Sequence, residues 1–69
     1  MIETPDGLIR PEVELIGNDG NAFSILGNCS RELKRAGNDQ SVVDAFMEEA
    51  MSGDYGHVLA TASAYCEVS

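Results

Sequence analysis

Residues 22–36, AFSILGNCSRELKRA, carry an amphipathic pattern that predicts a helix. At 100° per residue, one side of this helix is apolar and the opposite side is polar. The apolar stripe consists of Ala22, Ile25, Leu26, Cys29, Leu33 and Ala36, and the polar side of Ser24, Asn28, Arg31 and Arg35. The turn sequence at residues 17–20 precedes the helix, residues 19–21 can cap it, and Gly37-Asn38 ends it.

Two further helices are predicted after this one. The second runs from Asp39 or Gln40 to Met51, and the third follows Asp54, which can cap it. The inner face of the second helix contains Val42, Val43, Phe46, Met47 and Ala50, and that of the third contains Tyr55, Val58, Leu59, Ala62, Tyr65 and Cys66. Residues 12–16 alternate between polar and apolar, which predicts a short strand, and residues 67–69 can add a brief strand beside it.

These elements predict a small α+β or mostly α fold, with one short N-terminal strand, three amphipathic helices and a brief C-terminal strand. A chain of 69 residues has room for one domain. We assign residues 12–69 to that domain and residues 1–11 to a loosely ordered N-terminal arm with a turn at residues 5–7. The side chains expected to be mostly buried are Leu15, Leu26, Leu33, Phe46, Leu59 and Tyr65.

The charge of the chain is strongly negative and unevenly distributed. Twelve acidic residues against four Lys/Arg give a net charge of −8, and residues 36–69 contain six acids and no Lys or Arg. Nucleic acids and anionic membranes are bound through Lys and Arg, so we expect neither as a direct partner. The charge favours a larger protein with a basic surface.

The candidate partner-binding residues form an acidic face on the second helix and the start of the third. They are Asp44, Glu48, Glu49 and Asp54. Solubility alone is the competing explanation for these acids.

Two other surfaces are candidates for contacts. A basic patch in the first helix consists of Arg31, Lys34 and Arg35, and its simpler interpretation is pairing with nearby acids and with the helix dipole. A ridge of small side chains on the third helix consists of Gly56, Ala60, Ser63 and Ala64. Small side chains permit close helix approach, so the ridge predicts a homodimer, with an ordinary tightly packed inner seam as the alternative.

Catalytic motifs are not found in the sequence. His57 is expected to face solvent, and no phosphate-binding loop, zinc spacing or nucleophile elbow occurs. We therefore expect a non-enzyme without cofactor or metal. Cys29 and Cys66 lie on apolar stripes and are predicted to be small buried hydrophobic residues. The N-terminal residues lack the pattern of a signal peptide, so we expect a cytoplasmic location.

Two stretches carry a resemblance to a known group. Residues 17–27, GNDGNAFSILG, and residues 49–59, EAMSGDYGHVL, resemble a group of very short uncharacterised proteins of bacteriophages, prophages and other mobile elements. The resemblance implies a mobile-element origin and a place in the cytoplasm of a bacterial host cell, and it implies no activity and no site residue.

Two functional hypotheses follow. The first is a non-enzymatic acidic protein-binding module, a phage or mobile-element modulator or inhibitor of a host or defence protein that blocks a nucleic-acid-binding surface. The alternative is a small homo-oligomeric structural or regulatory accessory protein of a phage.

Overall fold

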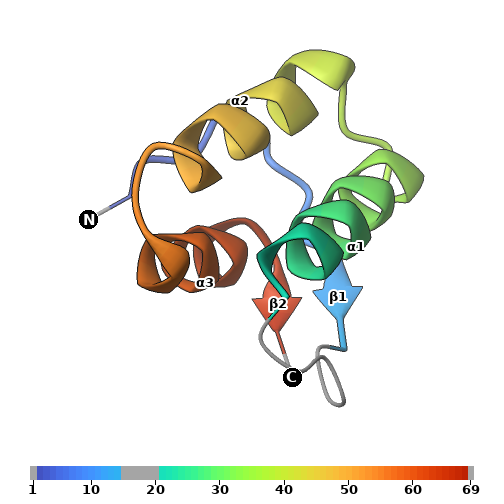
Figure 1. Cartoon of the computed structure of the whole chain (residues 1–69). Helices are drawn as coiled ribbons and strands as arrows, with labels where there is room; N and C mark the ends of the chain where they lie inside the picture. Colours follow the sequence, from blue (N-terminus) through green and yellow to red (C-terminus); the bar gives the residue numbers. More distant parts are fainter. Residues whose placement is uncertain (1, 15–20, 69) are drawn as a thin grey trace.

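Three helices and a two-stranded parallel sheet form the part of the chain that the structure describes, residues 2–14 and 21–68 (Figure 1). The structure is a computed structural model. In chain order the elements are β1 (Glu12–Val13), α1 (Ala22–Arg35), α2 (Gln40–Ala50), α3 (Tyr55–Tyr65) and β2 (Glu67–Val68). The predicted small α+β fold is confirmed, and the three helices lie close to their expected bounds.

Capping side chains begin two of the helices. The Asn21 side chain accepts a hydrogen bond from the Phe23 backbone N–H at 2.9 Å, and Asp54 Oδ1 accepts one from the His57 N–H at 3.0 Å. These bonds satisfy backbone donors that a helix start leaves without partners. Helix α1 is followed by Gly37 at φ +104°, a conformation that favours glycine because it has no Cβ.

The core lies where the three helices pack against one another. Phe46 and Leu33 are fully buried, and the Phe46 ring meets the Tyr65 ring edge to face at 5.4 Å between centroids. The prediction of buried side chains is confirmed for Leu26, Leu33, Phe46 and Tyr65, whereas Leu15 lies outside the described residues. The core cluster contains Val13, Ile25, Leu26, Cys29, Leu33, Val43, Phe46, Ala50, Val58, Ala62, Tyr65 and Cys66.

The predicted inner face of α3 is wrong at two of its six positions. Tyr55 is 40% exposed and Leu59 is 38% exposed, whereas Thr61, which was not predicted to face inward, is fully buried. Thr61 tolerates burial because its hydroxyl donates to the His57 carbonyl at 2.7 Å, one helical turn earlier. A pattern based on apolar residues alone cannot detect a threonine whose polar atom is satisfied in this way.

The sheet joins residues from near the two ends of the chain. Glu12 pairs with Glu67 and Val13 with Val68 in parallel register, which confirms the brief C-terminal strand. β1 covers only Glu12–Val13 of the strand expected over residues 12–16, and Glu14 lies outside it. Residues 15–16 and the turn expected at residues 17–20 lie outside the described residues.

Two polar side chains attach the N-terminal arm to the helices. Asn38 is buried and exchanges hydrogen bonds with the backbone of Ile9, donating to its oxygen at 2.8 Å and accepting from its N–H at 3.0 Å. Arg10 donates to the carbonyls of Ser63 and Cys66 and forms an ion pair with Glu67 at 2.6 Å. These contacts fix the path of the arm across the helices, while its expected looseness concerns motion and stays a prediction.

Candidate functional site

The four acids proposed for the acidic face fall into three different settings. Asp44 and Glu48 are exposed on the outer side of α2. Glu49 is half-buried and turns toward α3, where it contacts His57, while Asp54 caps α3. The structure therefore brings Glu48 and Glu49 to one surface hollow and leaves Asp44 and Asp54 outside it.

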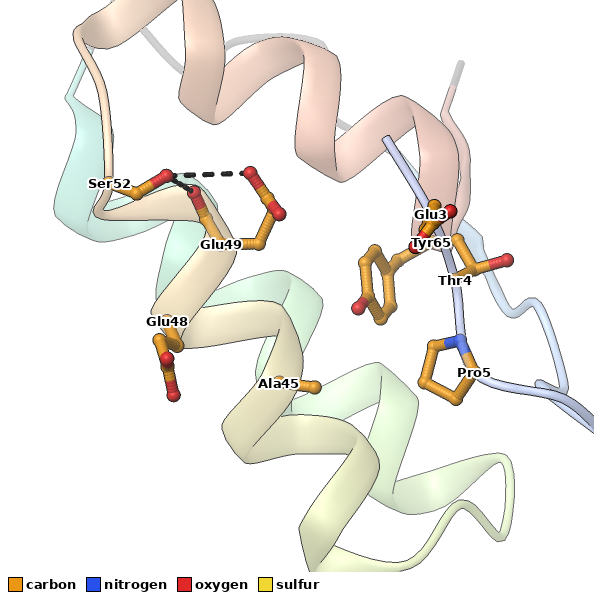
Figure 2. A pocket seen from close by; sticks show the side chains of 8 residues that line it. All are labelled: Glu3, Thr4, Pro5, Ala45, Glu48, Glu49, Ser52 and Tyr65. Carbon is orange, nitrogen blue, oxygen red and sulfur yellow. Dashed lines mark hydrogen bonds between the residues drawn. The ribbon is translucent and has the colours of Figure 1, made fainter. Parts of the chain in front are cut away.

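This hollow, here named the arm pocket, lies between the N-terminal arm and α2 (Figure 2). The arm contributes Glu3, Thr4 and Pro5 to its lining. Helix α2 and the residue that follows its end contribute Ala45, Glu48, Glu49 and Ser52, and Tyr65 of α3 completes the pocket. Three carboxylates thus meet around one pocket that also has apolar walls.

Tyr65 places a phenol in the arm pocket from the core side. Figure 2 shows its ring projecting from α3 toward α2, between Ala45 and the arm. Tyr65 is only 2% exposed, and among the described residues no buried side-chain oxygen or nitrogen lacks a hydrogen-bond partner. Burial, together with the negative charge of Glu49, raises the pKa of Tyr65 above its usual value of 10.0, so the phenol is neutral at pH 7.

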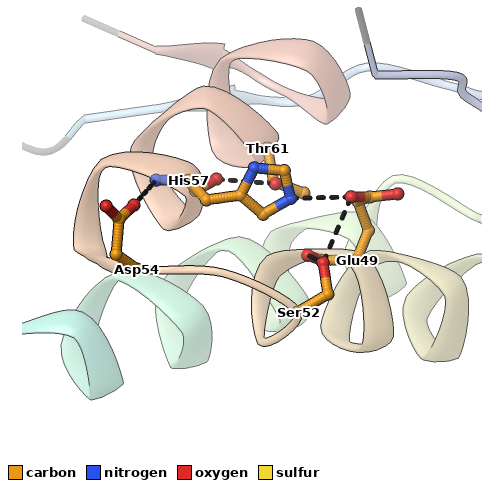
Figure 3. Close-up of polar contacts among 5 residues, drawn as sticks. All are labelled: Glu49, Ser52, Asp54, His57 and Thr61. Carbon is orange, nitrogen blue, oxygen red and sulfur yellow. Dashed lines mark hydrogen bonds and ion pairs between the residues drawn. The ribbon is translucent and has the colours of Figure 1, made fainter.

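His57 is the residue whose setting the sequence misjudged most. It was expected to face solvent, but its Nε2 lies 2.7 Å from Glu49 Oε2 and its side chain is 30% exposed (Figure 3). The reason is the true orientation of α3: the buried Thr61 lies one turn after His57, so the imidazole stands at the edge of the inner face and reaches α2.

The contacts around His57 do not form a catalytic arrangement. Ser52 Oγ donates to the backbone carbonyl of Glu49 at 2.7 Å and lies 3.4 Å from Glu49 Oε2 (Figure 3). The carboxylate therefore stands between the hydroxyl and the imidazole, whereas an activated serine requires the imidazole beside the hydroxyl. This group of side chains joins α2 to α3, and the absence of enzymatic activity stays a prediction.

The small-residue ridge is open to solvent along most of its length. Gly56, Ala60 and Ser63 are exposed, and Ala64 is half-buried. Ala60, Ser63 and Ala64 also line a second shallow pocket together with Ile2, Glu49 and His57. The ridge is thus one wall of a surface hollow, and its use in self-association stays a prediction.

The basic patch is engaged with its own neighbours. Glu32 Oε2 lies 3.5 Å from Arg31 Nε and 3.6 Å from Arg35 Nη1. Arg31 also donates to Asn28, and Lys34 donates to the Gln40 side chain. This geometry favours the intramolecular interpretation of these three cations.

A patch of exposed apolar side chains was missed in the sequence. Phe23 is 83% exposed, Met51 is 62% exposed and Tyr55 is 40% exposed, and they line a third pocket where the ends of α1, α2 and α3 meet. In the sequence, Phe23 could have indicated this patch, because it is a large apolar residue that lies outside the apolar stripe of its helix. Exposed patches of this kind mark contact surfaces in many proteins.

The two cysteines are free thiols in the core, as predicted. Interaction with the Cys66 thiol lowers the pKa of Cys29. The same interaction, with burial adding to it, raises the pKa of Cys66. No group of three or more His, Cys, Asp and Glu side chains that could hold a metal ion occurs among residues 2–14 and 21–68.

Comparisons with protein-family models, curated proteins and solved structures gave no match for this chain. None of the helices in the described part of the chain is long and apolar enough to cross a bilayer.

Proposed function

We propose that this chain is a non-enzymatic acidic protein-binding module that occupies a basic surface of a larger protein. The proposed setting is the cytoplasm of a bacterial host, where a phage or mobile element would use the module to inhibit or modulate a host or defence protein. The partner surface is one that otherwise holds nucleic acid, since closely spaced carboxylates and a phosphate backbone attract the same Lys and Arg side chains.

The observation that carries the proposal is the separation of charges on the folded chain. All four Lys and Arg residues contact side chains of this chain: Arg10 contacts Glu67, the two α1 arginines contact Glu32, and Lys34 contacts Gln40. Within residues 2–14 and 21–68, no Lys or Arg forms an ion pair with Asp44 or Glu48, which are exposed on α2. Asp44 accepts a hydrogen bond from the neutral Gln40 side chain at 3.0 Å, so both carboxylates keep their negative charge uncompensated by an ion pair within the described residues.

Charge reversal on α2 tests the proposal once a partner has been isolated by affinity purification from expressing bacteria. Asp44→Lys with Glu48→Lys should slow association with that partner by about tenfold or more at low salt, because electrostatic steering is lost. Added salt should shrink the difference, and nucleic acid should compete with the wild-type chain. Association rates are measured by stopped-flow or surface-based kinetics.

The matched control is Glu12→Lys with Glu14→Lys, which changes the net charge equally at exposed positions in and beside β1. This variant should associate faster than the α2 variant. An unchanged association rate for the α2 variant at low salt would show that the acids only keep the chain soluble.

A homo-oligomeric accessory protein is the second candidate, favoured by the exposure of Gly56, Ala60 and Ser63 on one side of α3. Ala60→Glu should then shift sedimentation from dimer to monomer without unfolding the chain. Each copy carries a net charge of −8, so salt should strengthen a dimer, opposite to its effect on docking with a basic partner. Ser41→Glu, at an exposed position of α2, is the control. A wild-type chain that sediments as a monomer at high micromolar concentration excludes this candidate.

A further inference from the structure

The hollow where the ends of the three helices meet is lined by large apolar side chains that solvent reaches. Phe23 lies in the first turn of α1, Met51 directly follows α2, and Tyr55 is the first residue of α3. Their exposed fractions are 83%, 62% and 40%. Single exposed apolar side chains are ordinary, but three from separate elements around one hollow form a contiguous surface, which we name the apolar patch.

The fold does not depend on these three side chains. In the described part of the chain, none of them belongs to the core cluster or to the apolar side chains packed against it. The start of α1 is stabilised by the Asn21 cap, and the start of α3 by the Asp54 cap. A polar residue would serve the fold equally well at position 23, so folding alone does not account for an exposed ring there.

The apolar patch continues the acidic face of α2. Asp44, Glu48 and Met51 are exposed and follow one another at spacings of four and three residues, which places them along one side of the helix and its end. A partner that docks on the α2 carboxylates therefore extends over Met51 and reaches the hollow beside it.

The positive charge of this chain lies away from the apolar patch. None of the described residues that line the hollow is a Lys or Arg, and the charged residue among them is Asp54. Arg31, the first cation of α1, lies about 12 Å further along the helix than Phe23 and contacts Glu32. A carboxylate and the faces of aromatic rings both attract cations. The hollow is thus apolar and electronegative at the same time.

We infer that the apolar patch holds an apolar side chain of the partner protein that has Lys or Arg residues beside it. The apolar side chain fills the hollow between Phe23, Met51 and Tyr55, and the neighbouring cation reaches Asp54 or the face of an aromatic ring. Aromatic residues and Met are enriched in protein interfaces, and Met adapts its shape to the group that it contacts. The inference rests on the proposed function, to which it adds an apolar anchor.

Other occupants fit the apolar patch less well. A second copy of this chain adds a further net charge of −8 and brings Lys and Arg side chains that contact their own chain. The phosphates of a nucleic acid are repelled by Asp54 and by the acids of α2. A basic protein with an apolar side chain on its surface meets neither obstacle.

The inference is tested by titrating the isotope-labelled full chain with short peptides at low ionic strength. The first probe, acetyl-KKLKK-amide, carries one leucine among lysines. The second, acetyl-KKSKK-amide, has the same charge without the leucine, and the third, acetyl-EELEE-amide, has the leucine with the opposite charge. The amide signals of Phe23 and Tyr55 and the methyl signal of Met51 should shift and saturate with the first probe.

The three probes should differ in affinity. The dissociation constant of the leucine probe should be about fivefold lower than that of the serine probe, because burial of the leucine adds to the attraction between charges. The acidic probe should produce no saturable shift, because its carboxylates are repelled by the chain.

Variants identify the contact. Phe23→Ser should weaken binding of the leucine probe about fivefold and leave binding of the serine probe unchanged. Phe23→Leu keeps an apolar side chain and should retain most of the difference between the two probes. Ile9→Ser is the matched control, because Ile9 is 48% exposed and lies outside the hollow. Circular dichroism melts check that each variant is folded, which we expect because Phe23 is 83% exposed.

The inference is overturned if the leucine and serine probes bind equally, if the acidic probe saturates the same signals, or if Ile9→Ser weakens binding as much as Phe23→Ser. A wild-type chain that sediments as a dimer, and becomes a monomer on Phe23→Ser, overturns it in favour of a second copy.

Failure of the proposed function looks different. In that case the leucine probe saturates the apolar patch with the expected preference, but charge reversal at Asp44 and Glu48 leaves association with the isolated partner unchanged. If charge reversal slows association while Phe23→Ser leaves the dissociation rate of the same complex unchanged, the binding module stays and only the apolar anchor is removed.

Discussion

Phe46→Ala is expected to lower the free energy of unfolding by about 3–5 kcal/mol, the range measured for fully buried aromatic residues. Phe46 has no exposed surface and packs edge to face against Tyr65 at 5.4 Å. The truncation would remove a ring from the core cluster and leave a cavity. Because small domains are only marginally stable, a loss of this size unfolds a large part of the population at ambient temperature.

Phe23→Ala is the matched control, since Phe23 is 83% exposed. It should change the free energy of unfolding by less than about 0.5 kcal/mol. Urea unfolding followed by far-ultraviolet circular dichroism measures both variants, and the chain contains no tryptophan for fluorescence. Leu33→Ala, at another fully buried position, should lower the free energy of unfolding by about 2–5 kcal/mol. If Phe46→Ala melted like the parent chain, the orientation of α2 would be wrong.

Asn38→Ala is expected to lower the free energy of unfolding by about 2–3 kcal/mol, because it leaves without hydrogen-bond partners the backbone groups that the Asn38 side chain now satisfies. Asn38 Nδ2 donates to the Ile9 and Leu33 carbonyls at 2.8 and 2.9 Å, and its Oδ1 accepts from the Ile9 N–H at 3.0 Å. An alanine offers none of these bonds. The arm would lose its main attachment next to α1.

Hydrogen exchange at the Ile9 amide reports this attachment directly. The amide should be protected in the wild-type chain and exchange faster in Asn38→Ala, while Asn28→Ala, which removes only an exposed contact with Arg31, should leave it protected. Rapid exchange at Ile9 in the wild-type chain would instead confirm a loosely ordered arm and remove this role for Asn38.

The apolar periodicity of the sequence was sufficient to predict the buried faces of α1 and α2. Leu33 and Phe46 lie on stripes of apolar residues broad enough to define one inner face, and both are fully buried. Helix α3 has small and apolar residues on several sides, so its orientation was ambiguous. Thr61 resolves it in the structure, by a hydrogen bond that has no signature in the sequence.

The arm pocket could not be predicted because its residues are brought together by polar contacts between distant segments. Glu3 and Tyr65 lie near opposite ends of the chain. They meet because Asn38 and Arg10 fix the course of the arm, and neither contact follows a helical or strand period. Glu48 was proposed as a candidate from its charge, and that role stays a prediction; its neighbours in the pocket depended on the course of the arm.

The parallel pairing of β1 with β2 delays completion of the fold while the ribosome is synthesising the chain. Glu12 and Val13 are made more than fifty residues before their partners Glu67 and Val68. The three helices contact one another over shorter separations and can associate first. Val13, only 3% exposed in the folded chain, must wait until Glu67 and Val68 have been made before its strand finds its partner.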